Sequence, residues 1–267
     1  MTLRNKVLSG AAAVALSAFA MPALADGYSG SVKDAAPAAP ERQFTWSVNG
    51  GITSDYVFRG FSQNDEDPTP FIGADIGYGI FYAGVWAAEV DDFFTASSAE
   101  IDLYAGIKPV LGPVTFDLGI IYYGYADQAD ALTVNVDYWE FKAGASITPF
   151  TNASVGAILY YSPDYTFETG EVFTVEGVAS YTLPTIWIFT PTIGGTVGYQ
   201  TSDDVAYENL NGFDEFMYWN AGLTLGVEKV ALDFRYWDTD VEDDGLGRNG
   251  KDLGDEKFVF TVKVTLP

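Results

Sequence analysis

The sequence predicts an all-β protein, an antiparallel up-and-down transmembrane β-barrel of about 12 strands. Three observations predict this fold. An export leader is followed by no apolar helix, apolar and polar residues alternate with a period of two, and the connections alternate between short and long. A chain of 267 residues is long enough for one large barrel.

The N-terminus has the pattern of a signal peptide. Arg4 and Lys6 form a basic region, an apolar run of mostly small residues follows, and Ala-Leu-Ala at residues 23–25 offers a cleavage site. We therefore expect residues 1–25 to be removed on export. Residues 26–42 are rich in Ala and Pro, which predicts a disordered segment before a barrel at residues 43–267. No stretch of about 18 apolar residues follows the leader, so we expect no transmembrane helix.

The first predicted strand covers residues 44–59. Aromatic residues at both ends of its apolar face are typical of the girdles at the two rims of an outer-membrane barrel. Roughly ten to twelve tilted residues are enough to cross the apolar band between those rims. The residues on this predicted outward face are Phe44, Trp46, Val48, Gly50, Ile52, Tyr56 and Phe58.

Eleven further strands follow from the same alternation. Short turns alternate with longer acidic loops between them, as periplasmic turns and external loops do in bacterial outer-membrane barrels. An even strand count places both chain ends in the periplasm. A soluble periplasmic β protein, the alternative fold, has no reason for this alternation. The strands are predicted at residues 70–80, 81–90, 98–110, 113–125, 136–148, 151–162, 172–183, 186–200, 216–228, 229–238 and 257–266.

The composition excludes several kinds of chemistry. The chain has no histidine and no cysteine, so Ser-His, Cys-His, histidine–zinc and disulfide chemistry are absent. We expect a protein that is not an enzyme and has no catalytic residue, metal site or cofactor. The acidic run at residues 238–244 lacks the Gly and Glu that an EF-hand loop requires and is predicted to be a solvated loop. A formal net charge of −24 makes nucleic acid a poor partner and cations good ones.

One motif resembles a known family. Residues 54–63, Ser-Asp-Tyr-Val-Phe-Arg-Gly-Phe-Ser-Gln, resemble the opening signature of the TorF-type family of proteobacterial porins, and the stretches at residues 81–86, 100–106 and 137–144 are similar to it too. The resemblance implies an outer-membrane β-barrel with no established substrate. The chain departs from the usual pattern of such barrels at its end, where Leu266-Pro267 replaces a terminal aromatic residue.

Charged residues on the predicted inward faces are the candidate pore-lining residues. Asp55 and Arg59 share the inward face of the first strand, where they could create a transverse field or simply form a lumenal ion pair. Inward rings could narrow the passage, stack on a solute or merely fill the lumen. These rings are Tyr104, Tyr123, Tyr160, Tyr218 and Trp237. The pore-lining candidates are Asp55, Arg59, Asp75, Glu89, Glu100, Asp102, Lys108, Asp117, Glu140, Lys142, Glu176, Asp233, Arg235 and Lys263.

These features predict a passive diffusion channel for small hydrophilic solutes in the cell outer membrane. Because acids outnumber bases among the candidates, we expect a weak preference for cations. The alternative is a non-conducting structural or adhesive barrel that acts through its acidic external loops. Outer-membrane lipid, lipopolysaccharide and the outer-membrane assembly machinery are the expected partners besides solutes. The sequence leaves the oligomeric state open.

Overall fold

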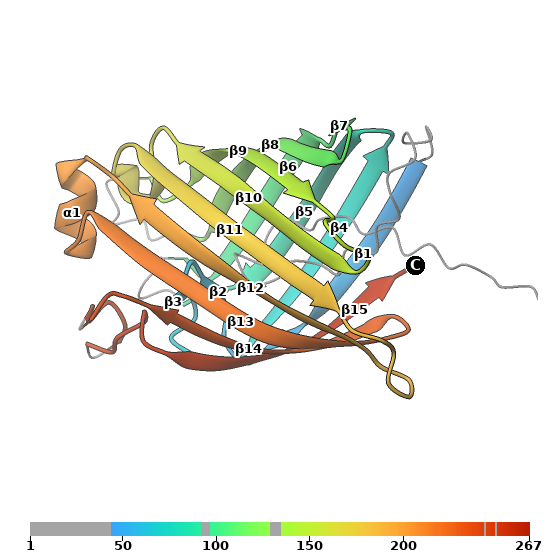
Figure 1. The fold of residues 1–267 in the computed structure, drawn as a ribbon. Coiled ribbons are helices and arrows are strands. Elements are labelled where there is room, and N and C mark those ends of the chain that lie inside the picture. Colours follow the sequence, from blue (N-terminus) through green and yellow to red (C-terminus); the bar gives the residue numbers. More distant parts are fainter. Residues whose placement is uncertain (1–43, 92–96, 129–134, 243, 249) are drawn as a thin grey trace, which may run out of the picture.

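Twelve long antiparallel strands and one short strand form a closed barrel in the computed structural model (Figure 1). The model describes residues 44–91, 97–128, 135–242, 244–248 and 250–267. Strands adjacent in sequence pair along the sheet, β1 pairs with β15, and the pairing of β6 with β8 completes the ring. The predicted fold class is confirmed. The predicted signal peptide and the Ala/Pro-rich segment lie outside the described residues.

The strand boundaries follow the predicted ones closely, with the largest differences at the first and the ninth predicted strands. The two-residue strand β7 (Val110–Leu111) was not predicted and pairs with the start of β8. The long strands are β1 (Phe44–Thr53), β4 (Thr69–Tyr78), β5 (Phe81–Glu89), β6 (Ala99–Ile107), β8 (Val114–Ala126), β9 (Tyr138–Ile147), β10 (Ala153–Ser162), β11 (Val172–Thr182), β12 (Thr190–Thr201), β13 (Glu215–Val227), β14 (Val230–Thr239) and β15 (Lys257–Leu266).

The alternation of the sequence becomes an apolar outside and a polar inside. On β6, Ile101 and Leu103 are exposed, whereas Glu100, Asp102 and Tyr104, which alternate with them, are buried. Successive side chains of a strand point to opposite faces, so one parity of each strand faces outward around the barrel. A continuous apolar exterior of this extent suits lipid rather than water. No helix in the described ranges is long and apolar enough to cross a membrane.

The two ends of the barrel differ. The long connections gather at one end, together with the short helices η1 (Thr166–Glu168) and α1 (Val205–Asn211), neither of which was predicted. Figure 1 shows α1 at the left and the short turns at the right. One turn at the short-turn end is longer than predicted, because β12 begins at Thr190 and an isolated bridge joins Ile186 to Phe189.

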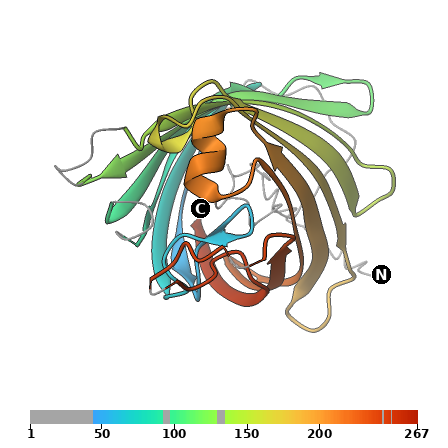
Figure 2. The ribbon, with the colours of Figure 1, turned by 90° about the vertical axis from the view of Figure 1, so that its left-hand side faces the viewer.

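The first connection folds into the barrel. β1 ends at Thr53, and the two-residue strands β2 (Val57–Phe58) and β3 (Phe61–Ser62) pair as a hairpin inside the ring of strands (Figure 2). We call residues 54–63 the inward hairpin.

The prediction of one strand over residues 44–59, with Tyr56 and Phe58 in an outward girdle, is therefore wrong. Those rings are only 4% and 8% exposed and pack against lumenal aromatic side chains. The reason lies in the backbone: Arg59 and Gly60 have φ values of 47° and 88°, which turn the chain back and interrupt an extended strand.

Candidate functional site: the barrel lumen

Arg59 anchors the inward hairpin to the barrel wall. Its Nη1 and Nη2 donate to Oε1 and Oε2 of Glu140 on β9 at 2.8 and 2.9 Å, and Nη1 also donates to Gln200 Oε1 on β12 at 2.9 Å. The guanidinium lies 4.7 Å from the ring centroid of Phe58 and 5.1 Å from that of Tyr160. Arg59 thus forms a lumenal ion pair, one of the two alternatives that the sequence left open, and its bidentate partner is Glu140 of the barrel wall.

Further hydrogen bonds fix the hairpin. Tyr56 Oη donates to Glu100 Oε1 on β6 at 2.6 Å, and the backbone N–H of Ser62 donates to the carbonyl of Leu253 at 3.0 Å. Within the hairpin, Ser62 Oγ donates to Asp55 Oδ1 at 2.6 Å. These contacts join one short segment to strands and a loop that are distant in sequence, so they hold the hairpin in place inside the barrel.

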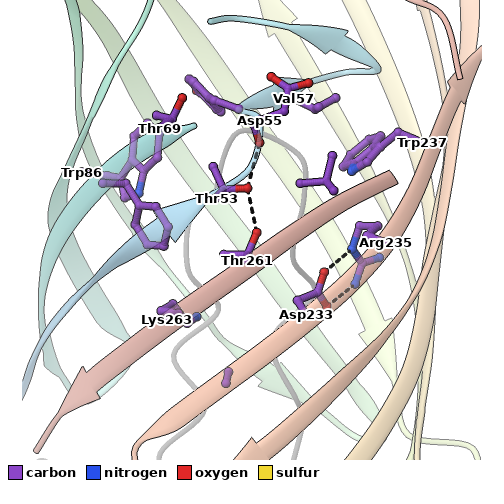
Figure 3. Close-up of a pocket in the computed structure, with 14 residues that line it drawn as sticks. Thr53, Asp55, Val57, Thr69, Trp86, Asp233, Arg235, Trp237, Thr261 and Lys263 are labelled. Atoms are coloured by element: carbon purple, nitrogen blue, oxygen red, sulfur yellow. Dashed lines mark hydrogen bonds and ion pairs between the residues drawn. The ribbon is translucent and has the colours of Figure 1, made fainter. Parts of the chain in front are cut away.

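A small cavity of about 50 Å³, lined by both charged and apolar side chains, remains between the hairpin and the wall (Figure 3). Asp55 lies on the hairpin side, while Arg235 of β14 and Lys263 of β15 lie on the wall side. Arg235 Nε donates to Asp233 Oδ1 at 3.0 Å. A space of this size holds a few water molecules at most, on the order of one per 30 Å³ of liquid volume. We call this cavity the lateral passage.

The Asp55 carboxyl group is buried in an unusual way. Its Oδ2 has no hydrogen-bond partner in the described part of the chain. Burial raises the pKa of Asp55 from 3.8 to about 6, and the Ser62 hydrogen bond and the charge of Lys257 only partly offset that effect. The Asp55 carboxyl group also lines the lateral passage, so a group that titrates near pH 6 lies at its edge.

Most of the other inward acids accept hydrogen bonds from tyrosines or lie beside bases; the exception is Asp102, whose Oδ1 has no hydrogen-bond partner in the described part of the chain. Tyr104 Oη donates to Asp75 Oδ1 at 2.5 Å, and Tyr218 Oη donates to Glu176 Oε1 at 2.7 Å. The five predicted inward rings are all buried. The predicted residues that the strands place inward and buried are Asp75, Glu100, Asp102, Glu140, Glu176, Asp233, Arg235 and Lys263.

Three predicted residues meet near the short turns. Lys142 Nζ lies 2.7 Å and Lys108 Nζ 3.9 Å from Asp117 Oδ2, and Tyr82 Oη donates to Asp117 Oδ1 at 2.7 Å. Glu89 joins no such group. It shares the outward parity of β5 with Phe81 and is exposed, so its predicted inward placement is wrong. The inward parity of β5 instead holds Trp86, which is 2% exposed.

A second, larger cavity opens on the other side of the inward hairpin, among the long connections. Its volume is about 350 Å³, and it shares no lining residue with the lateral passage. We call it the external vestibule. Sequence reasoning missed it, because its walls include loop residues such as Tyr165, Tyr207 and Phe213. The signal that could have found it was the presence of aromatic residues inside loops expected to be merely acidic.

An apolar exterior, a charged interior and a closed antiparallel ring define a porin-like transmembrane β-barrel of the outer-membrane type. Within that class, the chain belongs to the family described as "Bacterial protein of unknown function (Gcw_chp)", whose model matches residues 35–266. The description of this family does not mention TorF, so the resemblance to the TorF-type family is not confirmed. No curated protein matches the chain significantly in sequence.

Two solved porin structures share this fold. The KdgM porin in complex with disordered oligogalacturonate has a TM-score of 0.52 and 10% sequence identity, over 83% of this chain and 98% of that chain. The NanC porin has a TM-score of 0.52 and 12% identity, over 84% of this chain and 100% of that chain. At such identities the likeness shows a common barrel architecture.

Proposed function

We propose that the protein is a passive diffusion channel of the outer membrane for small hydrophilic solutes, with the inward hairpin as its constriction. The observation that carries this proposal is the lateral passage, where Asp55 faces Arg235 and Lys263 across a small cavity. An acid on one side and bases on the other would produce a transverse field across this cavity. The proposed transport needs no catalytic group and no cofactor.

The proposed cation preference is weak. The lateral passage itself is balanced, because Asp55 and Asp233 stand beside Arg235 and Lys263. Glu100, Asp102 and Glu140 are each at most 2% exposed, so they influence an ion through space and do not contact it. An excess of anionic loop residues would raise the cation concentration at the external mouth. In this location, lipid, lipopolysaccharide and the assembly machinery are the proposed partners.

Conductance in a planar bilayer tests the channel. We expect the refolded wild-type barrel to give small discrete steps, and a variant with residues 56–62 replaced by a Gly-Ser linker to give larger ones, because the constriction is gone. Heat-modifiable mobility checks that each variant is folded. In a salt gradient, the reversal potential should indicate a slight preference for cations. Equal conductance of two folded barrels would show that the hairpin does not limit flow.

The alternative is a non-conducting structural or adhesive barrel that acts through its external loops. It is favoured by the same hairpin, which packs its aromatic residues against the wall and leaves only about 50 Å³ beside Asp55. A silent bilayer for the folded wild type, together with steps for the linker variant, would support this second function. Such a result would identify the hairpin as a plug.

A further inference from the structure

The external vestibule is lined mainly by aromatic rings. They follow one another around the cavity: the ring centroids of Tyr138 and Tyr165 are 4.6 Å apart, those of Tyr165 and Tyr207 6.3 Å, and those of Tyr207 and Phe213 6.5 Å. Phe213 in turn stacks on Phe61 of the inward hairpin at 6.0 Å. Strand β9, two external loops, α1 and the hairpin thus contribute to one aromatic wall. Tyr138 and Tyr207 are only 3% and 2% exposed and support this wall, whereas Tyr165 and Phe213 are half-buried and present apolar surface to a ligand.

The vestibule carries almost no available charge. The chain has 37 acidic residues, yet none of the described residues that line this cavity is Asp or Glu. Arg59 lies at its boundary, but Glu140 holds the guanidinium bidentately at 2.8 and 2.9 Å. A charged ligand would lose its hydration here without gaining an opposite charge, so the site favours a neutral one.

Two fixed amides supply polar groups. Gln63 Nε2 donates to the carbonyl of Phe61 at 3.0 Å, and Asn211 Nδ2 donates to the carbonyl of Tyr207 at 2.9 Å. These bonds fix the orientation of both amides, and their side-chain oxygens make no hydrogen bond within the described part of the chain. Each oxygen is therefore an acceptor that suits a ligand hydroxyl.

We propose that the external vestibule binds a neutral saccharide. A pyranose ring presents an apolar C–H face, which suits the aromatic wall, and hydroxyl groups at its edges, which suit the amide oxygens. The volume of about 350 Å³ is within the usual range of small-molecule sites, roughly 300–1,000 Å³. That the bound sugar then passes the hairpin rests on the proposed channel function; the binding itself does not.

Saturation-transfer-difference NMR of the refolded full chain in detergent micelles tests the binding without requiring conduction. The probes are maltose, cellobiose and lactose, with glucuronate and glucosamine as charged counterparts. We expect transfer from the protein to the ring protons of at least one neutral disaccharide, and at least tenfold weaker binding of both charged sugars. Tyr165→Ala and Phe213→Ala should each weaken binding of the neutral disaccharide at least tenfold. Tyr165→Phe keeps the aromatic ring and should bind the disaccharide like the wild type.

The matched control is Trp187→Ala, which removes an aromatic side chain that is 84% exposed at the short-turn end of the barrel. It should leave the saturation transfer unchanged. The proposal is overturned if none of the three neutral disaccharides binds, if the charged sugars bind equally well, or if folded Tyr165→Ala binds like the wild type. Binding in a barrel that is silent in the bilayer would support the site and refute the channel.

Discussion

At the scale of single residues, most of the buried charges in the lumen have a partner of opposite charge or a hydrogen-bond donor. Arg59 and Glu140 are each 1% exposed and compensate one another directly. Glu100 and Glu176 are buried acids that accept hydrogen bonds from tyrosine hydroxyls of the inward hairpin and of β13. Burying a charge without such a partner costs free energy, so these contacts help to keep the inward hairpin in its position inside the barrel.

Asp55 makes stability depend on pH. Because the folded barrel holds its proton more tightly than the unfolded chain, with a pKa raised from 3.8 to about 6, its contribution is fully present below pH 3.8 and is lost as the pH rises to about 6. Asp55→Asn should therefore stabilise the barrel above about pH 6, by up to about 3 kcal/mol, and have little effect near pH 3.5. Urea unfolding in micelles at both pH values measures this difference.

Asp203→Asn is the control for that prediction, because Asp203 is exposed in the loop before α1. It should change the free energy of unfolding by less than about 0.5 kcal/mol at either pH. If Asp55→Asn destabilised the barrel equally at both pH values, the carboxyl group would be contributing only its hydrogen bond from Ser62.

At the scale of elements, the inward hairpin depends on a tight turn. Gly60 has a φ of 88°, and a Cβ atom there would lie 2.3 Å from Thr239 Cγ2 and 3.1 Å from Tyr218 Cβ. The turn therefore needs both a left-handed backbone and the absence of a side chain. Those two requirements explain why the hairpin can lie flat against β13 and β14.

Gly60→Ala should destabilise the barrel by more than the backbone strain alone. Strain at a left-handed residue costs about 1–2 kcal/mol, and the clash with the wall should add about 1–3 kcal/mol. Gly79→Ala is a matched control, since Gly79 has a φ of 61° and nothing within 4 Å of the added Cβ. Unfolding free energies of both variants separate the backbone strain from the steric clash. Equal losses of stability would mean that the hairpin shifts to accommodate the added methyl group at no cost.

At the scale of the whole molecule, the barrel is an inverted protein, with charges inside and apolar side chains outside. Leu103 on β6 is 52% exposed and Phe141 on β9 is 49% exposed, and both lie on the outward face of the barrel. Such an exterior is stable when lipid surrounds it, and in water it would promote aggregation. The membrane is therefore part of the folding free energy.

Leu103→Arg tests this view of the exterior. In lipid vesicles we expect a loss of about 2–4 kcal/mol of unfolding free energy, since an arginine would face the apolar interior of the bilayer. Val205→Arg on α1, where Val205 is 67% exposed, should cost less than about 0.5 kcal/mol because that helix lies among the external loops. Equal effects of the two substitutions would argue against a lipid-facing β6.

The sequence by itself determined the wall of the barrel. A period of two separates an inward from an outward face wherever a strand is regular, and this local rule placed Glu100, Asp102, Glu140 and Arg235 inside. The rule failed at Glu89, because both faces of β5 carry apolar residues and the alternation does not say which face meets the lipid. In the structure Trp86 faces the lumen, so Glu89 faces outward.

Only the tertiary structure decided what fills the barrel. Residues 54–59 continue the alternation of β1, and aromatic side chains suit both a membrane rim and a packed lumen, so the pattern alone does not distinguish an outward strand from an inward hairpin. The choice is made by contacts between distant residues: Arg59 meets Glu140 at a separation of 81 residues and Gln200 at 141. Periodicity encodes the local direction of a side chain, whereas the pairing of buried charges requires the closed ring to bring their strands together.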